Sequence, residues 1–144
     1  MSLAMTKTER EAFLAEAHVG VLGAPEEGRA PMLAPVWYSY QPGGAVRVIT
    51  GPRSRKARLV AASGRLSLCV QTETAPYKYV TVEGPVTSTT EVDADERRTM
   101  AHRYLGAELG DMYVEATRAD AQGDVVIEVM PEHWRTTDYG KQFG

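Results

Sequence analysis

Residues 50–58 read TGPRSRKAR and hold the strongest local signal in the sequence. Ser54 is expected to cap a helix that starts here, and the free N–H groups and positive dipole end of a helix N-terminus favour an anion. Arg55 is able to grip a phosphate with two parallel hydrogen bonds, Lys56 adds a point charge, and Arg58 follows on the same helical face. The pattern therefore predicts a phosphate site, with a solvated basic turn as the alternative.

The chain on both sides of this turn is expected to alternate strands with a few capped helices. Helices are expected at residues 6–18, 54–63, 93–105 and 109–119. Strands are expected at residues 19–22, 32–40, 45–50, 66–71, 77–91 and 125–130, and residues 132–144 are expected to form a polar tail.

Particular residues mark the boundaries of these elements. Thr6 with Glu9, and Asp93 with Glu96, fit the capping-box pattern, and Gly64 fits a helix stop. A hairpin turn is expected at residues 41–44, Pro35 indicates a bulge or an edge position, and residues 84–85 should bend the longest strand. Most strands are joined by hairpins, so we expect a mainly β, antiparallel β-barrel with short helices. A doubly wound sheet would need a helix after nearly every strand.

The composition fits one domain over residues 1–144. Hydrophobic residues make up 43% of the 144 residues and charged residues 24%, which is typical of a globular protein. The net charge of -3 and the pI near 5.6 argue against a nucleic-acid or acidic membrane partner. There is neither a long apolar stretch nor a leader pattern, so we expect a cytoplasmic protein; residues 1–4 are interpreted as a cloning remnant.

The turn and its flanking strands resemble the pyridoxamine 5′-phosphate oxidase-like split β-barrel superfamily. The resemblance covers roughly residues 15–135, and the Ser54-Arg55-Lys56 block is its most specific part. The other matching segments are VWY at residues 36–38, Thr50, LSL at residues 66–68 and VTVEG at residues 80–84. The resemblance implies a flavin-binding, antiparallel split barrel.

The same resemblance implies a cofactor and the residues that contact it. The Arg and Lys that match Arg55 and Lys56 hold the phosphate of FMN or of the deazaflavin coenzyme F-420. The strand that carries Val48 and Ile49 and ends at Thr50 runs along the isoalloxazine ring. The cofactor of this superfamily lies in a groove between two subunits, so the resemblance also implies a homodimer.

The sequence departs from the oxidase that gives the superfamily its name. That enzyme has a basic residue at each end of the run that matches residues 34–39, and this chain has none there. A flavin-contacting glutamine falls at Tyr79, and the long C-terminal substrate segment is reduced to residues 133–135. We therefore do not expect oxidation of pyridoxamine phosphate. The short chain with a tail tryptophan is more similar to the small actinobacterial-type reductases that use coenzyme F-420 or FMN.

Four aromatic residues and one histidine receive weaker interpretations. Trp37 and Tyr38 point to opposite faces of one strand, so we expect one in the core and the other near the ring. Tyr79 is expected either to lie near the cofactor of a partner subunit or to be a surface residue of an edge strand with no functional role. His133 and Trp134 are expected either to close the cofactor groove or to lie on a surface tail.

We interpret the chain as an oxidoreductase that transfers hydride to or from a small organic substrate. The cofactor carries the chemistry, and the sequence offers no catalytic residue that we can assign. No metal site is expected. The alternatives are a non-catalytic flavin carrier or sensor and, less in keeping with the acidic pI, a small barrel that binds single-stranded nucleic acid.

Overall fold

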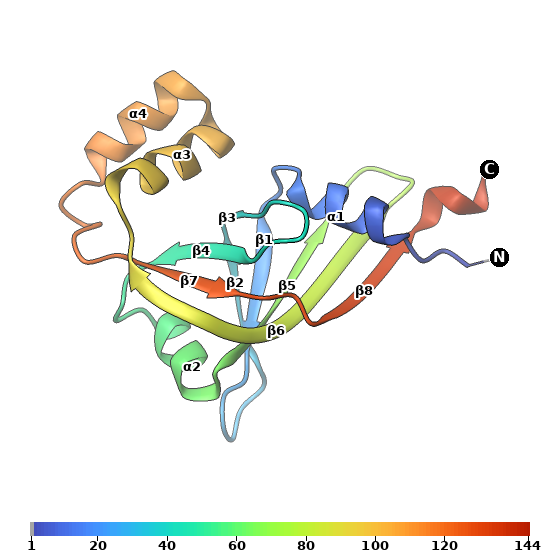
Figure 1. The fold of residues 1–144 in the computed structure, drawn as a ribbon, viewed down its shortest axis with the longest axis horizontal. Helices are drawn as coiled ribbons and strands as arrows, with labels where there is room; N and C mark the ends of the chain where they lie inside the picture. Colours follow the sequence, from blue (N-terminus) through green and yellow to red (C-terminus); the bar gives the residue numbers. More distant parts are fainter. Residues whose placement is uncertain (1) are drawn as a thin grey trace.

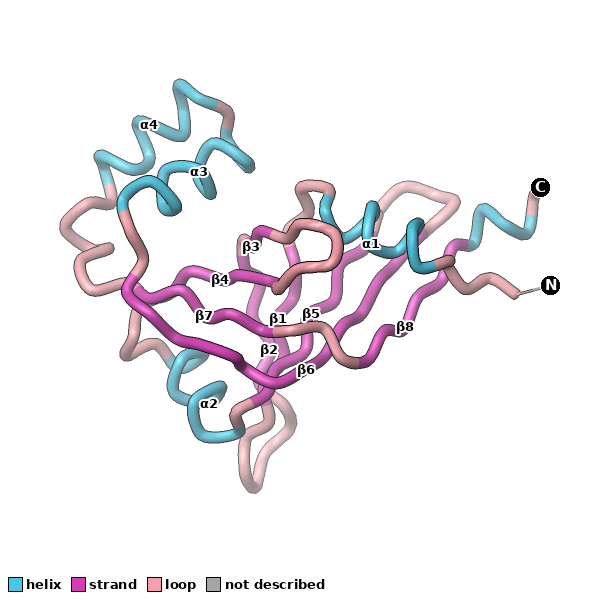
Figure 2. The backbone as a smooth tube through the Cα atoms, in the orientation of Figure 1, coloured by secondary structure: helices cyan, strands magenta, loops and turns pink. Residues whose placement is uncertain are grey.

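The computed structural model describes residues 2–144, whose strands form one curled antiparallel sheet (Figures 1 and 2). Its order is β2-β1-β5-β6-β7-β4-β3, and β8 pairs with β6 outside this path. The strands are β1 (Gly20–Ala24), β2 (Met32–Val36), β3 (Tyr38–Ser39), β4 (Val46–Thr50), β5 (Arg65–Gln71), β6 (Lys78–Glu91), β7 (Val125–Val129) and β8 (His133–Asp138). The expected mainly β split barrel is thus confirmed.

The long strand β6 joins the two halves of the sheet. Its first half pairs with β5 and β8, and its second half pairs with β7. The predicted bend is present, because the register shifts between Val86 and Ser88, just after Gly84. A Cβ atom on Gly84 would lie 1.9 Å from the Met130 carbonyl oxygen, so only glycine allows the chain to pass so closely here.

The core fills the inside of the curled sheet and follows the two-residue alternation of the strands. In β4, Val46 and Val48 face inward and are at most 1% exposed. In β6, Val80 and Val82 do the same, while Thr81 between them faces outward. Burial of these apolar side chains is the main stabilising contribution of the fold.

Four α-helices and one 3-10 helix accompany the sheet. They are α1 (Lys7–Ala15), α2 (Arg55–Ser63), α3 (Ala94–Leu105), α4 (Ala107–Ala116) and the 3-10 helix η1 (Tyr139–Gln142). The expected cap of α1 is a complete capping box at Thr6, and Gly64 ends α2 with a φ of 71°. Asp93 caps α3, but the capping-box prediction for Glu96 is wrong, because that carboxylate pairs with Arg47 of β4 instead.

Other sequence-based expectations also differ from the structure. The strand expected at residues 32–40 is two strands, because the chain breaks at Trp37 and β3 pairs with β4 instead of β1. The polar tail expected at residues 132–144 contains β8, which supplies hydrogen-bond partners for β6. The first helix ends at Ala15, short of residue 18.

The N-terminal residues of the chain lie close to β8 and are part of the fold. The backbone carbonyl of Leu3 accepts a hydrogen bond from the Asp138 N–H, and Met5 is buried. Met1, the first residue of the stretch interpreted as a cloning remnant, lies outside the described residues. None of the described helices has the length and apolar character needed to cross a membrane.

Candidate functional site

The basic turn is fixed by the end of β4 and the N-terminus of α2. Thr50, a buried residue at the end of β4, has its Oγ1 atom 3.0 Å from the Ser54 Oγ atom. The Ser54 hydroxyl also accepts the Ala57 N–H at 3.1 Å, as expected for an N-cap. The first N–H groups of α2 therefore lie at a defined place, beside the cations that follow Ser54.

A carboxylate from another part of the chain lies at this turn. Both oxygens of Glu26, in the loop between β1 and β2, accept hydrogen bonds from the Arg55 guanidinium. These contacts keep the pKa of Glu26 below its ordinary value. Glu26 and Arg55 line a shallow cavity of about 430 Å³ together with Arg29, Arg58 and Leu59. Three guanidinium groups face one carboxylate there, so the cavity carries net positive charge.

The two remaining cations of the predicted site differ in their surroundings. Arg58 lines the cavity beside Arg55, as the helical spacing predicts. Lys56 is half-buried on the neighbouring face of α2, and it has no ion-pair partner among residues 2–144. The structure therefore brings Thr50, Ser54, Arg55 and Arg58 together with Lys56 next to them. Whether they hold a phosphate stays a prediction.

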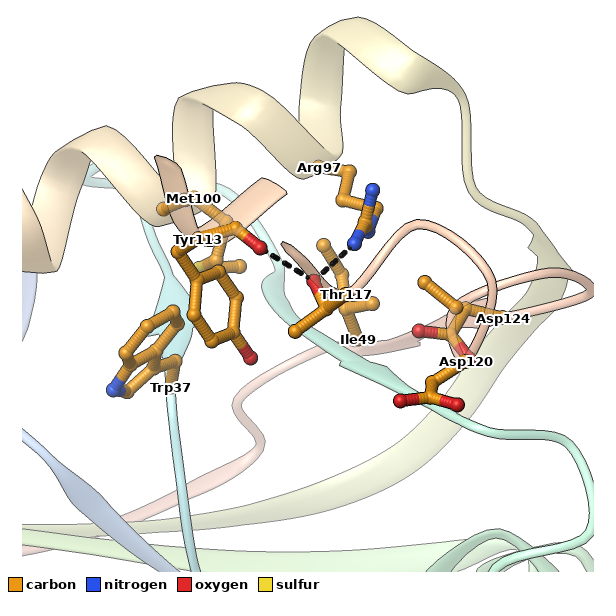
Figure 3. A pocket seen from close by; sticks show the side chains of 10 residues that line it. Trp37, Ile49, Arg97, Met100, Tyr113, Thr117, Asp120 and Asp124 are labelled. Atoms are coloured by element: carbon orange, nitrogen blue, oxygen red, sulfur yellow. Dashed lines mark hydrogen bonds between the residues drawn. The ribbon is translucent and has the colours of Figure 1, made fainter. Parts of the chain in front are cut away.

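The predicted ring contacts at the end of strand β4 lie on opposite faces of the strand. Val48 faces the core and is 1% exposed, so only its backbone is able to meet a ligand. Ile49 faces outward and lines a second cavity, of about 230 Å³, between β4 and the helices α3 and α4 (Figure 3). Trp37 lines the same cavity, while Tyr38 is fully buried and donates its hydroxyl proton to the Leu14 carbonyl at 2.7 Å. The expectation that one of Trp37 and Tyr38 lies in the core is therefore confirmed for Tyr38.

Acidic residues lie at the other side of this second cavity. Figure 3 shows Asp120 and Asp124 across from Trp37 and Tyr113. Burial raises the pKa of Asp124, and a Cβ atom on Gly51 would lie 3.8 Å from its Oδ1 atom. The second cavity therefore reaches the start of the basic turn.

Two predicted site residues lie on a different part of the sheet. Tyr79 faces outward on the first half of β6, opposite Gln71 and Thr137 in register. Trp134 in β8 packs against the core and has the Arg10 guanidinium 4.5 Å from its ring centroid. Figure 1 shows β8 well apart from α2, so one chain does not bring these residues to the basic turn.

Sequence reasoning did not point to four residues that line the two cavities, Glu26, Arg29, Tyr113 and Asp124. Each lies far along the chain from the basic turn, and none belongs to a local motif. Among residues 2–144, no group of three or more His, Cys, Asp or Glu side chains is placed to hold a metal ion.

Comparisons with known proteins agree with this architecture. The family model described as "Pyridoxamine 5'-phosphate oxidase" matches residues 6–138. No curated protein sequence matches the chain.

Three of the similar solved structures cover most of the chain at low identity. A conserved hypothetical protein from Mycobacterium tuberculosis has a TM-score of 0.78 at 19% identity, covering 99% of this chain and 91% of its own. An F420 reductase has a TM-score of 0.64 at 20% identity, covering 87% and 94%. A FAD-binding protein from Mesorhizobium loti has a TM-score of 0.63 at 18% identity, covering 92% and 93%. At these identities the likeness shows the fold.

Proposed function

Because the chain belongs to the pyridoxamine 5′-phosphate oxidase family, we propose that it is a flavin- or deazaflavin-dependent oxidoreductase. It would transfer hydride between FMN or coenzyme F-420 and a small organic substrate. The observation that carries the proposal is the basic turn, where Ser54 caps α2 and Arg55 and Arg58 line one positive cavity. The F420 reductase and the FAD-binding protein among the structural neighbours support a cofactor of this type.

The residues of the turn fit a phosphate group. The backbone N–H groups of Arg55 and Lys56 belong to the first turn of α2 and have no partner within the helix. Arg55 would supply a two-pronged donor and Lys56 a second cation, and the helix dipole adds to their attraction for an anion. Thr50 and Ser54 would hold these donors in place, because their hydroxyl contact joins the end of β4 to the cap.

The bound cofactor would supply the hydride chemistry, and the chain would bind and orient it. Ile49 on the outer face of β4 would lie along the ring, with Trp37 next to it. No residue is assigned as a catalytic acid or base. The lack of basic residues at positions 34–39 supports a substrate other than pyridoxamine phosphate.

Two other functions remain as alternatives to be tested. A carrier or sensor would bind the cofactor through the same turn without turnover. A single-stranded nucleic-acid binder would need a basic groove, but Glu26 already pairs with Arg55, and the net charge of the chain is -3. The oxidoreductase proposal is favoured over the second alternative on charge alone.

Stopped-flow oxidation of pre-reduced FMN and F-420 tests the proposal. The protein is mixed with each reduced cofactor and a panel of quinones and enones, beside an oligonucleotide titration at two salt concentrations. An oxidoreductase accelerates oxidation with at least one acceptor. Tight binding without acceleration would identify a carrier, and salt-sensitive oligonucleotide affinity would overturn the flavin proposal.

We also propose that the enzyme is a homodimer. The outward face of β1, β2, β5 and β6 carries a groove of about 900 Å³ whose lining includes Val21, Leu33 and Cys69. Leu33 is 69% exposed, which is unusual for a leucine in a strand. A second copy on this face would also bring its own Tyr79 and Trp134 to the assembly.

A further inference from the structure

Helix α4 carries an apolar stripe that stays exposed to solvent. Leu109, Met112 and Ala116 are spaced by three and then four residues, so they lie on one face of the helix. Leu109 is 52% exposed, Met112 is 61% exposed, and Ala116 is exposed as well. An amphipathic helix ordinarily turns such a face toward the core of its own protein. The stripe is therefore suited to a partner outside the chain.

The face of α4 that packs on the protein is a different one. Gly110 lies about 100° around the helix axis from Leu109 and approaches α3 so closely that a Cβ atom there would lie 3.1 Å from the His102 backbone nitrogen. Asp111 reinforces this contact, because its Oδ1 atom lies 2.9 Å from Arg98 Nε and 2.7 Å from His102 Nε2. Figure 1 shows the two helices side by side at one end of the molecule. α4 is thus held in place by α3 and presents the stripe as an outer face.

Acidic residues flank the stripe at the spacing of a coiled coil. The three stripe residues occupy the a, d and next a positions of a heptad, which places Glu108 and Glu115 at g. Glu108 has no ion-pair partner among residues 2–144, and Glu115 pairs with Arg118 where both side chains are at least 70% exposed. Such an exposed pair contributes little, so both glutamates remain available to a partner.

The surroundings of the stripe are acidic as a whole. Residues 106–124 contain five acidic residues and one arginine, so this segment is more negative than the complete chain, whose net charge is -3. The charges at g positions set the partner choice of a coiled-coil helix, because they pair with charges at e positions of the partner. A helix with lysine or arginine at e therefore complements α4 in both its apolar stripe and its charge.

A second copy of the same helix fits the stripe less well than a basic helix. In an antiparallel contact of two α4 helices, the g positions face each other, so Glu108 and Glu115 would lie against the same glutamates of the other copy. Like charges placed together across an interface weaken binding. In a parallel contact, g would face Tyr113 at e, which offers no charge to pair with the glutamates.

We propose that the stripe of α4 is a docking surface for a basic amphipathic helix of another protein. The apolar side chains of the partner would pack on Leu109 and Met112, and its lysines or arginines would face Glu108 and Glu115. α4 has 10 residues and is about 15 Å long, so the contact is small and the binding transient. The stripe is separate from the basic turn, and the inference does not depend on the proposed cofactor.

Fluorescence anisotropy with a labelled synthetic helix tests the proposal on the full chain. The probe is a peptide of leucine and lysine, about two heptads long, with leucine at every a and d position and lysine elsewhere. A scrambled peptide of the same composition keeps the charge without the stripe, and a leucine–glutamate peptide keeps the stripe with the opposite charge. We expect the leucine–lysine helix to bind at least about tenfold more tightly than either control peptide. Equal affinity for the probe and either control, or no binding of the probe, would overturn the proposal.

Matched variants locate the binding on α4. Met112→Asp and Leu109→Asp should each weaken binding of the leucine–lysine helix at least about tenfold, as the loss of an apolar anchor does. Phe143→Asp makes the same kind of change at a side chain that is 81% exposed near the C-terminus, and it should leave the affinity unchanged. If Phe143→Asp weakens binding as much as the two α4 variants do, the stripe is not the binding site.

A pair of double variants measures the contribution of charge. Glu108→Gln combined with Glu115→Gln should weaken binding of the leucine–lysine helix about threefold, the size of two exposed ion pairs. Glu27→Gln combined with Glu73→Gln removes two exposed carboxylates outside α4 and is the control. Equal weakening by the two double variants would show only a general attraction of opposite charges and would overturn the assigned class of partner.

Sedimentation velocity of the same variants tests a second copy as the occupant. Met112→Asp and Leu109→Asp should keep the circular dichroism spectrum of the wild type, because both side chains are exposed. They should also keep its oligomeric state, because the proposed partner is a different protein. A wild-type oligomer that both variants dissociate, while Phe143→Asp does not, would show that a second copy covers the stripe and would overturn the proposal.

Discussion

At the residue scale, Arg55 pairs with the carboxylate of Glu26, and the proposed function gives it a second, competing partner in the phosphate of a cofactor. Its guanidinium already donates to both Glu26 oxygens, with Arg55 Nη2 to Glu26 Oε1 at 2.6 Å. A phosphate that uses the same donors has to displace Glu26 or share the guanidinium with it. The affinity of the turn for a phosphate should therefore depend on Glu26, whereas the affinity for a neutral ligand should not.

Replacing Glu26 tests this competition. Glu26→Gln keeps the shape but removes the charge, so FMN should bind about tenfold more tightly, the size of one charged hydrogen bond. Glu27→Gln removes the neighbouring exposed carboxylate and is the matched control. Fluorescence titrations with FMN and riboflavin measure both variants. Equal tightening by the two variants, or an equal gain for riboflavin, would show that only the general field changed.

Arg55 and Lys56 themselves should contribute strongly to cofactor affinity. We expect Arg55→Ala and Lys56→Ala each to weaken FMN binding by about 1.5–3 kcal/mol, the range for a hydrogen bond to a charged group. Both variants should fold, since Arg55 is exposed and Lys56 is half-buried at the surface. Arg118→Ala, at another exposed arginine, is the control. Unchanged affinity in both turn variants would remove the phosphate assignment.

Residues that act together at the candidate sites were only partly predictable from sequence. Ser54, Arg55 and Arg58 are neighbours along the chain, so helical spacing alone places them on one turn. Glu26 and Asp124 reach the site through tertiary packing, and no local pattern connects either of them to Arg55. Sequence analysis thus predicted the cations of the turn but not the carboxylates that surround them.

At the scale of elements, local chemistry predicted helix starts better than strand partners. Thr6, Ser54 and Asp93 each accept a backbone N–H three residues on, as their sequence patterns indicate. β8 was missed because its sequence is polar and it forms only where β6 offers free backbone groups. Glu96 was misjudged for a similar reason, since Arg47 on β4 attracts its carboxylate away from the cap.

The crossing of β6 with the segment after β7 depends on Gly84. Gly84→Ala would place a methyl group 1.9 Å from the Met130 carbonyl oxygen, a backbone atom that cannot move aside alone. We expect a loss of about 2–3 kcal/mol in the free energy of unfolding, as for overpacked sites. Gly23→Ala, whose Cβ would have no neighbour closer than 3.4 Å, is the control. Urea unfolding of both variants measures the difference. Equal free energies of unfolding for the two variants would contradict the close contact between Gly84 and Met130.

The contact of α1 with η1 should respond to acid. Hydrogen bonds from Lys141 and then Thr6 lower the pKa of Glu9 from 4.5 to about 2. A lowered pKa means that the unfolded chain binds more protons in this window, so the stabilisation is present above about pH 4.5 and is lost as the pH falls toward about 2.

Thermal unfolding across this range measures the effect. The wild-type Tm should fall more steeply between about pH 4.5 and about 2 than that of Glu9→Gln, which has no charge to lose. Lys141→Met should also flatten the dependence, because it removes the first cause of the shift. Parallel curves for wild type and Glu9→Gln would show that this contact does not contribute.

At the scale of the whole molecule, the outward face of the sheet is suited to a partner. Pro35, Val21, Cys69 and Thr81 stand in one row across four neighbouring strands, β2, β1, β5 and β6. The row beside it continues through Leu33, Gly23 and Ser67. These residues are uncharged, although on β6 and β8 the two rows continue to Glu83 and Arg135, so the part of the surface on β2, β1 and β5 would lose little polar hydration when covered.

We predict a homodimer that buries more than about 2,000 Å² through this face, the size of obligate pairs. Leu33→Asp would place a charge within such an interface, where the carboxylate would lose its water without gaining a partner. Sedimentation velocity at micromolar concentration should show a dimer for the wild type and a monomer for Leu33→Asp. Phe143→Asp, at an exposed apolar residue near the C-terminus, should remain dimeric.

Cofactor affinity should be measured in the same samples. If the cofactor groove is shared by two subunits, Leu33→Asp should lose cofactor binding together with the dimer. A wild-type monomer that still binds FMN would show that one chain forms the complete site.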